Sequence, residues 1–309
     1  MVNVFDEVFV VGSGRVASEC LRTLKANSIN AVYVPSEDSG GYNSLNRLCE
    51  QLGITYMNIP RASLKEYFMG ITSNSLIISA HNSYIFPAEV IDKPNLTIYN
   101  MHIALLPKYR GMNAATWAIF NREEFAGVTW HIVKAKIDSG AILLQEKIRI
   151  DEDDTAMKLM LKCFNAGCRL FRENLEGFLS GGLVPHEGDS SGENRLYLAK
   201  DLPNDGYANL NWDFGQLWAF LRSMDYTGAN IMPLPKITIG GKDFEVVGYK
   251  TDTNTQNSYK GISELRIYTY GGGIFCSCVK CKNFMHIERM YRHKKSSGQH
   301  FIRRNILSR

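Results

Sequence analysis

A short apolar run that ends in glycines and leads straight into an amphipathic helix constrains the fold of this chain more than any other feature. Residues 8–14 read Val-Phe-Val-Val-Gly-Ser-Gly, a pattern typical of a strand buried on both faces. In residues 15–26, Val16, Cys20 and Leu24 recur at helical spacing and form one apolar face. A strand, a sharp turn and a helix in this order predict an α/β domain built on a parallel sheet.

The same alternation of strands and helices continues along the chain. The further strands that we expect lie at residues 31–35, 54–59, 76–79, 96–100, 129–134 and 141–150, and the helices at 45–52, 63–69 and 155–179. The last helix ends at Gly181 and Gly182, since glycine readily adopts the left-handed conformation that closes a helix. The predicted fold is therefore α/β, with a Rossmann-like parallel sheet and helices on both faces.

A change of composition indicates a second domain. Residues 185–208 are polar and rich in Gly, Ser, Asn and Asp, as linkers are. Beyond them, a helix at 214–224 precedes strand-like runs separated by glycine turns, which predict antiparallel hairpins. We expect a larger first domain at 1–185, a linker at 186–208 and a smaller β-rich C-terminal domain at 209–309.

The overall composition is that of an ordinary globular protein. The chain has 309 residues, of which 45% are hydrophobic and 21% charged, and its formal net charge is +4. This charge is smaller than nucleic-acid binders usually carry. Acidic residues precede a short apolar run at the start, unlike a signal peptide, and no run approaches the roughly 18 to 20 apolar residues of a membrane helix. We expect a cytoplasmic protein without a membrane or nucleic-acid partner, and the seven scattered cysteines predict no disulfide framework.

Three polar residues indicate chemistry on a carbonyl group. Asn100 and His102 stand one residue apart at the end of an expected strand, and the carboxyl ends of strands in an open α/β sheet are where ligands bind. An amide can donate to a developing oxyanion, and an imidazole can accept a proton. Asp138, before a glycine turn, supplies a carboxylate to orient the imidazole. On spacing alone a structural interpretation stays equally open, with Asn100 in a turn, His102 at a helix start and Asp138 as a cap.

A longer pattern surrounds these three residues. It consists of Asn100-x-His102, Leu-Leu-Pro-Lys-Tyr-Arg-Gly at 105–111, Trp-Ala-Ile at 117–119, Gly-Val-Thr at 127–129 and Asp138-x-Gly140. This stretch resembles the folate-dependent formyltransferase family, which includes methionyl-tRNA formyltransferase, sugar-nucleotide N-formyltransferases and formylation domains of peptide synthetases. Weaker similarity extends from the first strand to about Gly182 and resumes at 211–228. One departure is Ala141, where many members carry a second Asp.

The resemblance implies an N-formyltransferase that uses 10-formyltetrahydrofolate as its formyl donor. It also implies that Asn100 donates to the oxyanion, that His102 is the general base, and that Asp138 stabilises the imidazolium and fixes its tautomer. The folate is expected between the Asp138 turn and the loop at 83–86. That loop lies in the segment at 82–87, which matches a family segment whose backbone borders the pterin, although only Ile85 and Pro87 keep their identity. The expected cofactor-binding residues are Ser83, Tyr84, Ile85, Phe86, Leu105 and Ser139.

The same resemblance narrows the range of candidate acceptor molecules. Gly-Val-Thr-Trp-His at 127–131, followed by Ile137 and Asp138, looks more like the sugar and peptide-synthetase members than the tRNA member. The amine of a nucleotide-linked amino sugar is therefore the first expectation, and an aminoacyl group on a carrier protein or on methionyl-tRNA is the alternative. A rival of another class is a dinucleotide-binding protein, which would rest on the turn at 12–17 with Glu37 and Asp38. That rival does not account for the polar trio. The sequence leaves open whether the chain forms a homodimer.

Two features near the C-terminus remain. Cys276, Cys278 and Cys281, followed by His286 and His293, raise the question of a zinc site. Their spacing does not match the paired C-x-x-C of structural zinc sites, so we expect no metal and interpret the cysteines as sheet residues. The basic tail at 289–309 is interpreted as a solvated end, with phosphate contact as the alternative.

Overall fold

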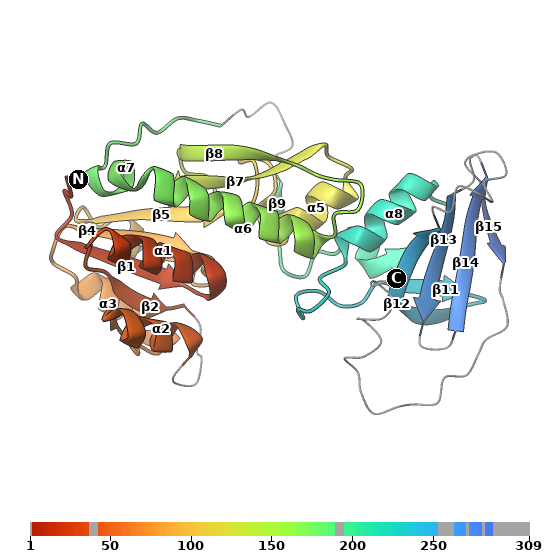
Figure 1. Cartoon of the computed structure of the whole chain (residues 1–309), viewed down its shortest axis with the longest axis horizontal. Helices are drawn as coiled ribbons and strands as arrows, with labels where there is room; N and C mark the ends of the chain where they lie inside the picture. The colour runs from red at the N-terminus through yellow and green to blue at the C-terminus, as the bar shows by residue number, and fades with distance from the viewer. Residues whose placement is uncertain are drawn as a thin grey trace. The chain divides into compact units, whose positions relative to one another are not determined.

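The computed structural model describes residues 2–36, 43–188, 195–252, 263–269, 272–279 and 282–286. These residues form two compact units, each with a large sheet of its own (Figure 1). The first unit comprises Met1–Ala114, Phe125–Arg149 and Met160–Leu198, and the second comprises Ala115–Glu124, Ile150–Leu159 and Ala199–Arg309. The units differ from the expected domains at 1–185 and 209–309, because two segments that precede residue 185 belong to the second unit.

The first unit is built on a sheet of seven strands in the order β3-β2-β1-β4-β5-β7-β8. The strands are β1 Glu7–Gly12, β2 Val32–Pro35, β3 Thr55–Tyr56, β4 Ser75–Ala80, β5 Leu96–His102, β7 Phe125–Ile132 and β8 Ile142–Arg149. The α/β fold class is confirmed, but the sheet is not parallel throughout, since β7 pairs antiparallel with both β5 and β8. Only residues 133–141 join β7 to β8, which is too short for the crossover that a parallel pair requires.

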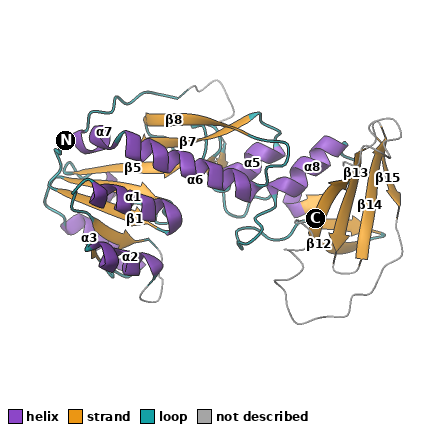
Figure 2. Cartoon of the chain, viewed as in Figure 1, coloured by secondary structure: helices purple, strands orange, loops and turns teal. Residues whose placement is uncertain are grey.

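Helices of the first unit lie against this sheet (Figure 2). They are α1 Gly14–Ala26, α2 Ser44–Leu52, α3 Leu64–Gly70, α4 Ala88–Ile91, residues 160–173 of α6 Ala156–Glu173, α7 Leu175–Ser180 and the 3-10 turn η1 Arg61–Ser63. The single helix expected at 155–179 is divided at Asn174 into α6 and α7. Gly181 closes α7 in the left-handed conformation, with a φ of 64°. None of the helices in the described ranges has the length and apolarity needed to cross a bilayer.

Side chains of β5 alternate between two cores on opposite faces of the sheet. Ile98 belongs to a core that α3 and α4 cover. Tyr99 points to the other face, where its ring centroid lies 5.8 Å from that of Phe178 on α7. Because successive residues of a strand face opposite ways, Asn100 and His102 lie on the same face as Ile98, at the carboxyl end of the strand.

The glycine turn after β1 brings two strand ends together. A Cβ at Gly12 would lie 1.9 Å from the carbonyl oxygen of Ala80 at the end of β4, so only glycine fits there. The N–H and the hydroxyl of Ser13 also donate to main-chain oxygens at that strand end. Close packing therefore accounts for this turn. Glu37 and Asp38, on which the dinucleotide interpretation also depends, lie outside the described residues.

Part of the expected linker is built into the first unit. β9 Leu196–Tyr197 pairs in parallel with β6 Arg110–Gly111 in the loop after β5. The main chain of His186 also exchanges hydrogen bonds with that of Ile142 at the start of β8. Strand pairing thus ties these residues of the expected linker at 186–208 to the loop and the sheet.

The second unit contains a six-stranded sheet in the order β10-β11-β12-β13-β14-β15. Its elements are α5 Ala114–Phe120 (from Ala115), η2 Pro203–Gly206, β10 Tyr207–Ala208, α8 Phe214–Ser223, β11 Lys236–Ile239, β12 Lys242–Asp252, β13 Ser263–Thr269, β14 Gly272–Val279 and β15 Lys282–His286. The strands from β11 onward pair antiparallel, as the glycine turns predict. Phe220 and Leu221 of α8 form its core together with Ile237 and Ile267 of the sheet.

The cysteine cluster and the basic tail fall at the edge of what the structure describes. Cys281, His293 and residues 287–309 lie outside the described residues, as do the side chains of Cys276 and Cys278. The expectation that they bind no metal therefore stays a prediction.

Candidate active site

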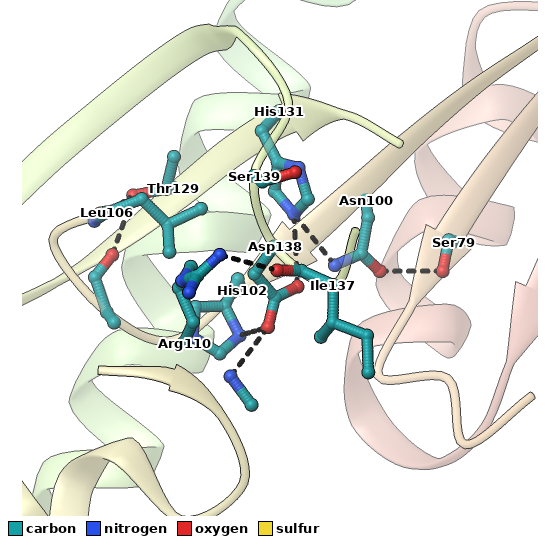
Figure 3. A network of polar contacts seen from close by, with 12 residues as sticks. Ser79, Asn100, His102, Leu106, Arg110, Thr129, His131, Ile137, Asp138 and Ser139 are labelled. Atoms are coloured by element: carbon teal, nitrogen blue, oxygen red, sulfur yellow. Dashed lines mark hydrogen bonds and ion pairs between the residues drawn. The ribbon is translucent and has the colours of Figure 1, made fainter. Parts of the chain in front are cut away.

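Polar side chains from three neighbouring strands form a row across the first sheet. Ser79 on β4 and His131 on β7 lie in register with Asn100 on β5, one on each side of it. The Ser79 hydroxyl lies 2.7 Å from Asn100 Oδ1, and Asn100 Nδ2 lies 3.1 Å from His131 Nε2 (Figure 3). Strand pairing thus holds Asn100 from both sides. The sequence assigned no role to Ser79 or His131, because register across a sheet is not visible in local spacing.

His102, the last residue of β5, is buried and held by a main-chain group. Its Nε2 lies 2.8 Å from the carbonyl oxygen of Tyr109. A carbonyl oxygen only accepts, so this contact requires a hydrogen on Nε2. In a neutral imidazole the lone pair is then on Nδ1, which lies 3.5 Å from Asp138 Oδ2.

Asp138 reaches the same place from the turn between β7 and β8. Its backbone has a φ of 47°, in the left-handed region that Asp tolerates better than most residues. Oδ2 accepts a hydrogen bond of 2.8 Å from the Gly111 N–H, and Oδ1 lies 3.5 Å from His131 Nε2. The carboxylate therefore faces both histidines and one main-chain donor.

These neighbours determine the charge of the Asp138 carboxyl. Burial raises its pKa, but His102, His131 and the Gly111 N–H together outweigh burial and hold the pKa well below the usual range. Asp138 is consequently an anion at neutral pH. An anion next to an imidazole stabilises the protonated form of that imidazole, which is what a general base becomes after it accepts a proton.

The structure brings the three predicted catalytic residues into one site. His102 and Asp138 are neighbours, and His131 connects Asp138 with Asn100. The structural interpretation fails for two of them, since Asn100 and His102 are strand residues and not turn or helix-start residues. The site thus offers an amide donor, an imidazole whose Nδ1 does not contact Tyr109, and a carboxylate that is ionised at neutral pH. Together these groups can support attack of an amine on a carbonyl carbon.

The loop after β5 is anchored through a buried threonine. The Thr129 hydroxyl donates to the Ala104 carbonyl over 2.6 Å and accepts from the Leu106 N–H and from Gln145 Nε2. Gln145 Nε2 also donates to the Leu106 carbonyl, at 3.1 Å. These contacts hold the loop that carries Tyr109 against β7 and β8. They give the Gly-Val-Thr motif a physical reason, because its Thr side chain ties the loop to the sheet.

Leu105 and Ser139 are two of the predicted cofactor-binding residues. A Cβ at Gly127 would lie 2.3 Å from Leu105 Cδ2, so the leucine packs closely on the glycine backbone of β7. Ser139 is exposed, and its hydroxyl donates to the Lys136 carbonyl over 2.7 Å. That bond joins the two ends of the turn that contains Asp138.

The Ser83–Phe86 loop is the other predicted cofactor-binding segment. Arg61 holds it, because one guanidinium nitrogen donates to the Ser83 hydroxyl at 3.0 Å and the other to the Ser83 carbonyl at 2.7 Å. Phe86 is buried in the core beneath α3, and Tyr84 packs partly against that core, whereas Ile85 is 69% exposed. Ser83 and Ile85 are the exposed residues of this loop, and Arg61 already engages the Ser83 hydroxyl, so a ligand would meet mainly the Ile85 side chain and the backbone.

The site contains nothing that resembles a metal centre. Within the described part of the chain, no group of three or more His, Cys, Asp or Glu side chains could hold a metal ion. His102, His131 and Asp138 instead engage one another and main-chain groups.

Comparison with known proteins agrees with this geometry. The model of the formyl transferase family matches residues 7–175, and the chain belongs to this family of formyl-transferring enzymes. It is 30% identical over 247 residues to the GDP-perosamine N-formyltransferase of Brucella melitensis biotype 1, covering 77% of this chain and 91% of that protein. The resemblance inferred from the Asn-x-His and Asp-x-Gly motifs is thereby confirmed.

Two further proteins are similar to this chain. It is 37% identical over 112 residues to the methionyl-tRNA formyltransferase of Caldanaerobacter subterraneus subsp. tengcongensis, covering 36% of each chain. The crystal structure of the N-formyltransferase from Helicobacter canadensis, in complex with folinic acid and dTDP-3-aminofucose, superposes with a TM-score of 0.66. That match has 18% sequence identity and covers 84% of this chain and 94% of the other, so it establishes the fold.

Proposed function

We propose that this enzyme transfers a formyl group from 10-formyltetrahydrofolate to the primary amine of a nucleotide-linked amino sugar. The observation that carries the proposal is the grouping of His102 with the ionised Asp138 beside Asn100, at the carboxyl end of β5. This grouping suits the transfer of a formyl group to an amine, because such a transfer needs an oxyanion donor and a base with a stabilised conjugate acid.

The residues act in a definite order in this mechanism. The folate supplies the formyl carbon as an electrophile when it is bound. Asn100 Nδ2 donates a hydrogen bond to the formyl oxygen as negative charge develops on it. His102 Nδ1 accepts the proton that the attacking amine loses and can return it to the leaving nitrogen. Asp138 stabilises the imidazolium between these two transfers.

We assign Asp138 a narrower role than the resemblance implied, and we give Tyr109 a role of its own. The resemblance implied that Asp138 fixes the tautomer of His102. The 2.8 Å contact between His102 Nε2 and the Tyr109 carbonyl supports assigning that task to the loop after β5. Asp138 then has one electrostatic task, namely to stabilise a proton on Nδ1.

Six residues are proposed to border the folate: Ser83, Tyr84, Ile85, Phe86, Leu105 and Ser139. The Ser83–Phe86 loop fits this role because Arg61 and the core under α3 hold its conformation, which leaves main-chain groups and the exposed Ile85 side chain for a planar ring. A loop fixed in advance loses little conformational entropy when it binds a ligand.

An amino sugar is favoured over other acceptors by the relatives. The Brucella protein acts on GDP-perosamine according to its name, and its alignment covers 77% of this chain. The alignments with the methionyl-tRNA formyltransferases of Caldanaerobacter and Lachnospira eligens cover 36% and 63% of it. The modest net charge of +4 also suits a nucleotide diphosphate better than a polynucleotide. An aminoacyl group, on a carrier protein or on methionyl-tRNA, is the alternative.

The test is a screen of acceptors with the purified full chain. GDP- and dTDP-linked amino sugars, aminoacyl carrier proteins and methionyl-tRNA would each be incubated with 10-formyltetrahydrofolate. Formation of the formamide would be followed by mass spectrometry, and tetrahydrofolate release by absorbance. We expect both products with at least one amino sugar. Formylation of another class of acceptor with none of any amino sugar would contradict the proposal. So would formamide formation that does not depend on the folate.

A further inference from the structure

The carboxamide of Asn100 lies in the middle of a chain of hydrogen bonds that starts and ends at main-chain groups. We propose that Asn82 and His131 are positioning residues that determine the orientation of this carboxamide. In that orientation its NH2 group can donate to the formyl oxygen. The inference rests on the proposed function, because it takes Asn100 to be the oxyanion donor.

The direction of the bonds is fixed at one end by Tyr84. Its N–H donates to Asn82 Oδ1 over 2.8 Å, so the oxygen of the Asn82 amide must point that way. Asn82 Nδ2 then lies 3.1 Å from the Ser79 hydroxyl and donates to it. Ser79 has a single proton to give, and Asn100 Oδ1 lies 2.7 Å away to accept it. These contacts through Asn82 and Ser79 require that the oxygen of the Asn100 amide faces β4.

The other end is fixed by Ile132. Its carbonyl oxygen lies 3.0 Å from His131 Nδ1 and can only accept, so Nδ1 carries the hydrogen. The neutral imidazole then has its lone pair on Nε2, where Asn100 Nδ2 donates over 3.1 Å. These contacts through His131 require that the nitrogen of the Asn100 amide faces β7. Two independent main-chain groups therefore require the same orientation of the carboxamide.

The competing arrangement places a proton on His131 Nε2. Asp138 Oδ1 favours it, but from 3.5 Å, at the outer limit of a hydrogen bond. An N–H on Nε2 would face the NH2 group of Asn100, so the carboxamide would have to turn over. Its NH2 group would then face Ser79, whose hydroxyl would receive two donors and lose its acceptor. The distances from Asn100 to Ser79 and to His131 fit the first arrangement, whereas the 3.5 Å contact between His131 Nε2 and Asp138 Oδ1, which helps to lower the Asp138 pKa, favours the second.

This network has a functional consequence. One N–H of Asn100 Nδ2 is used by His131, and the second remains available for an oxyanion. Asn82 also begins the segment that contains the Ser83–Phe86 loop, so the proposed folate loop and the oxyanion donor share one hydrogen-bond network. A turned carboxamide would present its oxygen to the oxyanion and oppose the reaction.

The first test needs no substrate. Nitrogen NMR of the full chain labelled at histidine reports which ring nitrogen carries a hydrogen, and the signals of His131 would be assigned with His131→Gln. We expect His131 to be neutral with its hydrogen on Nδ1 at neutral pH. A hydrogen on Nε2, or on both nitrogens, would overturn the inference. Because no turnover is measured, this result stands even if the enzyme formylates none of the acceptors tried.

The second test reverses the network with almost no change of volume. Asn82→Asp keeps the acceptor for the Tyr84 N–H but loses the donor to Ser79, so the Ser79 proton turns toward the new carboxylate and Asn100 Oδ1 loses its partner. We expect kcat to fall on the order of tenfold or more, with KM for the acceptor within about twofold of wild type. The side-chain amide signals of Asn100 should shift as well.

The matched control is Asn27→Asp. The Asn27 amide closes the end of α1 by donating to the Thr23 carbonyl, and it belongs to neither the row nor the folate loop. We expect kcat and the Asn100 amide signals to stay as in wild type. Unchanged kcat and unchanged amide signals in Asn82→Asp would overturn the inference. A loss of kcat in both variants would indicate a general loss of stability, and the histidine NMR would then decide.

Discussion

The Nε2 atom of His102 lies 2.8 Å from the carbonyl oxygen of Tyr109, so the loop after β5 determines the tautomer of this histidine. Tyr109 itself has a φ of 55°, a conformation that few non-glycine residues adopt and that the surrounding contacts must maintain. The lone pair on Nδ1 then lies 3.5 Å from an ionised Asp138. The main-chain contact and the neighbouring carboxylate are thus supplied by two different segments of the chain.

Removal of any one of the three proposed catalytic groups should abolish most of the turnover. Asn100→Ala, His102→Ala and Asp138→Ala should each lower kcat on the order of a hundredfold or more, because each group acts mainly in the transition state. Steady-state kinetics would measure the loss, and circular dichroism would check that each variant folds. Near-normal turnover in His102→Ala would rule out the proposed base.

The stability of the protein should depend on pH through Asp138. The folded-state pKa of its carboxyl is lowered, so its stabilising contribution is fully present above the unfolded-state value of about 4 and is lost as pH falls below that value toward the folded-state pKa. Urea unfolding at several pH values should show wild type to be more stable than Asp138→Asn at pH 7, with the difference shrinking below about pH 4.

The control for this pH series is Asp92→Asn, at an exposed position after α4. Its difference from wild type measures, at each pH, the effect of removing a carboxylate from the surface. A constant difference between wild type and Asp138→Asn across the whole range would contradict the assigned environment of Asp138.

The Asp138 turn should not tolerate a side chain at Gly140. A Cβ there would lie 1.7 Å from the Ile132 carbonyl oxygen, so the turn would have to move. We expect Gly140→Ala to destabilise the protein by about 2 kcal/mol and to lower kcat, because it displaces Asp138. Gly70→Ala, at an exposed position with no atom within 4 Å of the added Cβ, should change neither quantity appreciably. Equal stability of the two variants would contradict the close packing of the turn.

The acceptor should be a small molecule. Binding of tRNA falls steeply with salt because every neutralised phosphate releases counterions, and a net charge of +4 offers little to offset this. We expect turnover on a nucleotide-linked amino sugar and no measurable formylation of methionyl-tRNA at physiological salt. Efficient formylation of methionyl-tRNA, with none on any amino sugar, would reverse the choice of acceptor and leave the chemistry of formyl transfer intact.

The cysteines near the C-terminus should not bind zinc in a fixed ratio. The C-x-C-x-x-C spacing of Cys276, Cys278 and Cys281 lacks a convincing set of four ligands. Elemental analysis of the purified protein should find well below one zinc per chain. A full equivalent of zinc that disappears when Cys278 and Cys281 are both replaced would prove the prediction wrong.

The sequence by itself determined the fold class, the family and the residues proposed to do the chemistry. Strand and helix periodicities are local, so the apolar runs and the glycine turns at 12–14 and 181–182 already predicted an α/β sheet. The Asn-x-His pair is also local, because residues one apart on a strand share a face. These are the features that neighbouring residues encode.

Only the tertiary structure decided the direction of β7, the pairing of β9 with the loop after β5, and the neighbours of Asn100. Each of these depends on which strands lie side by side and in what register, and periodicity determines the face of a side chain but not its partner across the sheet. Ser79 and His131 are 52 residues apart in the sequence numbering, yet the pairing of β4, β5 and β7 places both against one carboxamide. The site therefore follows from the sheet as a whole, because hydrogen bonds between strands connect residues that no local pattern relates.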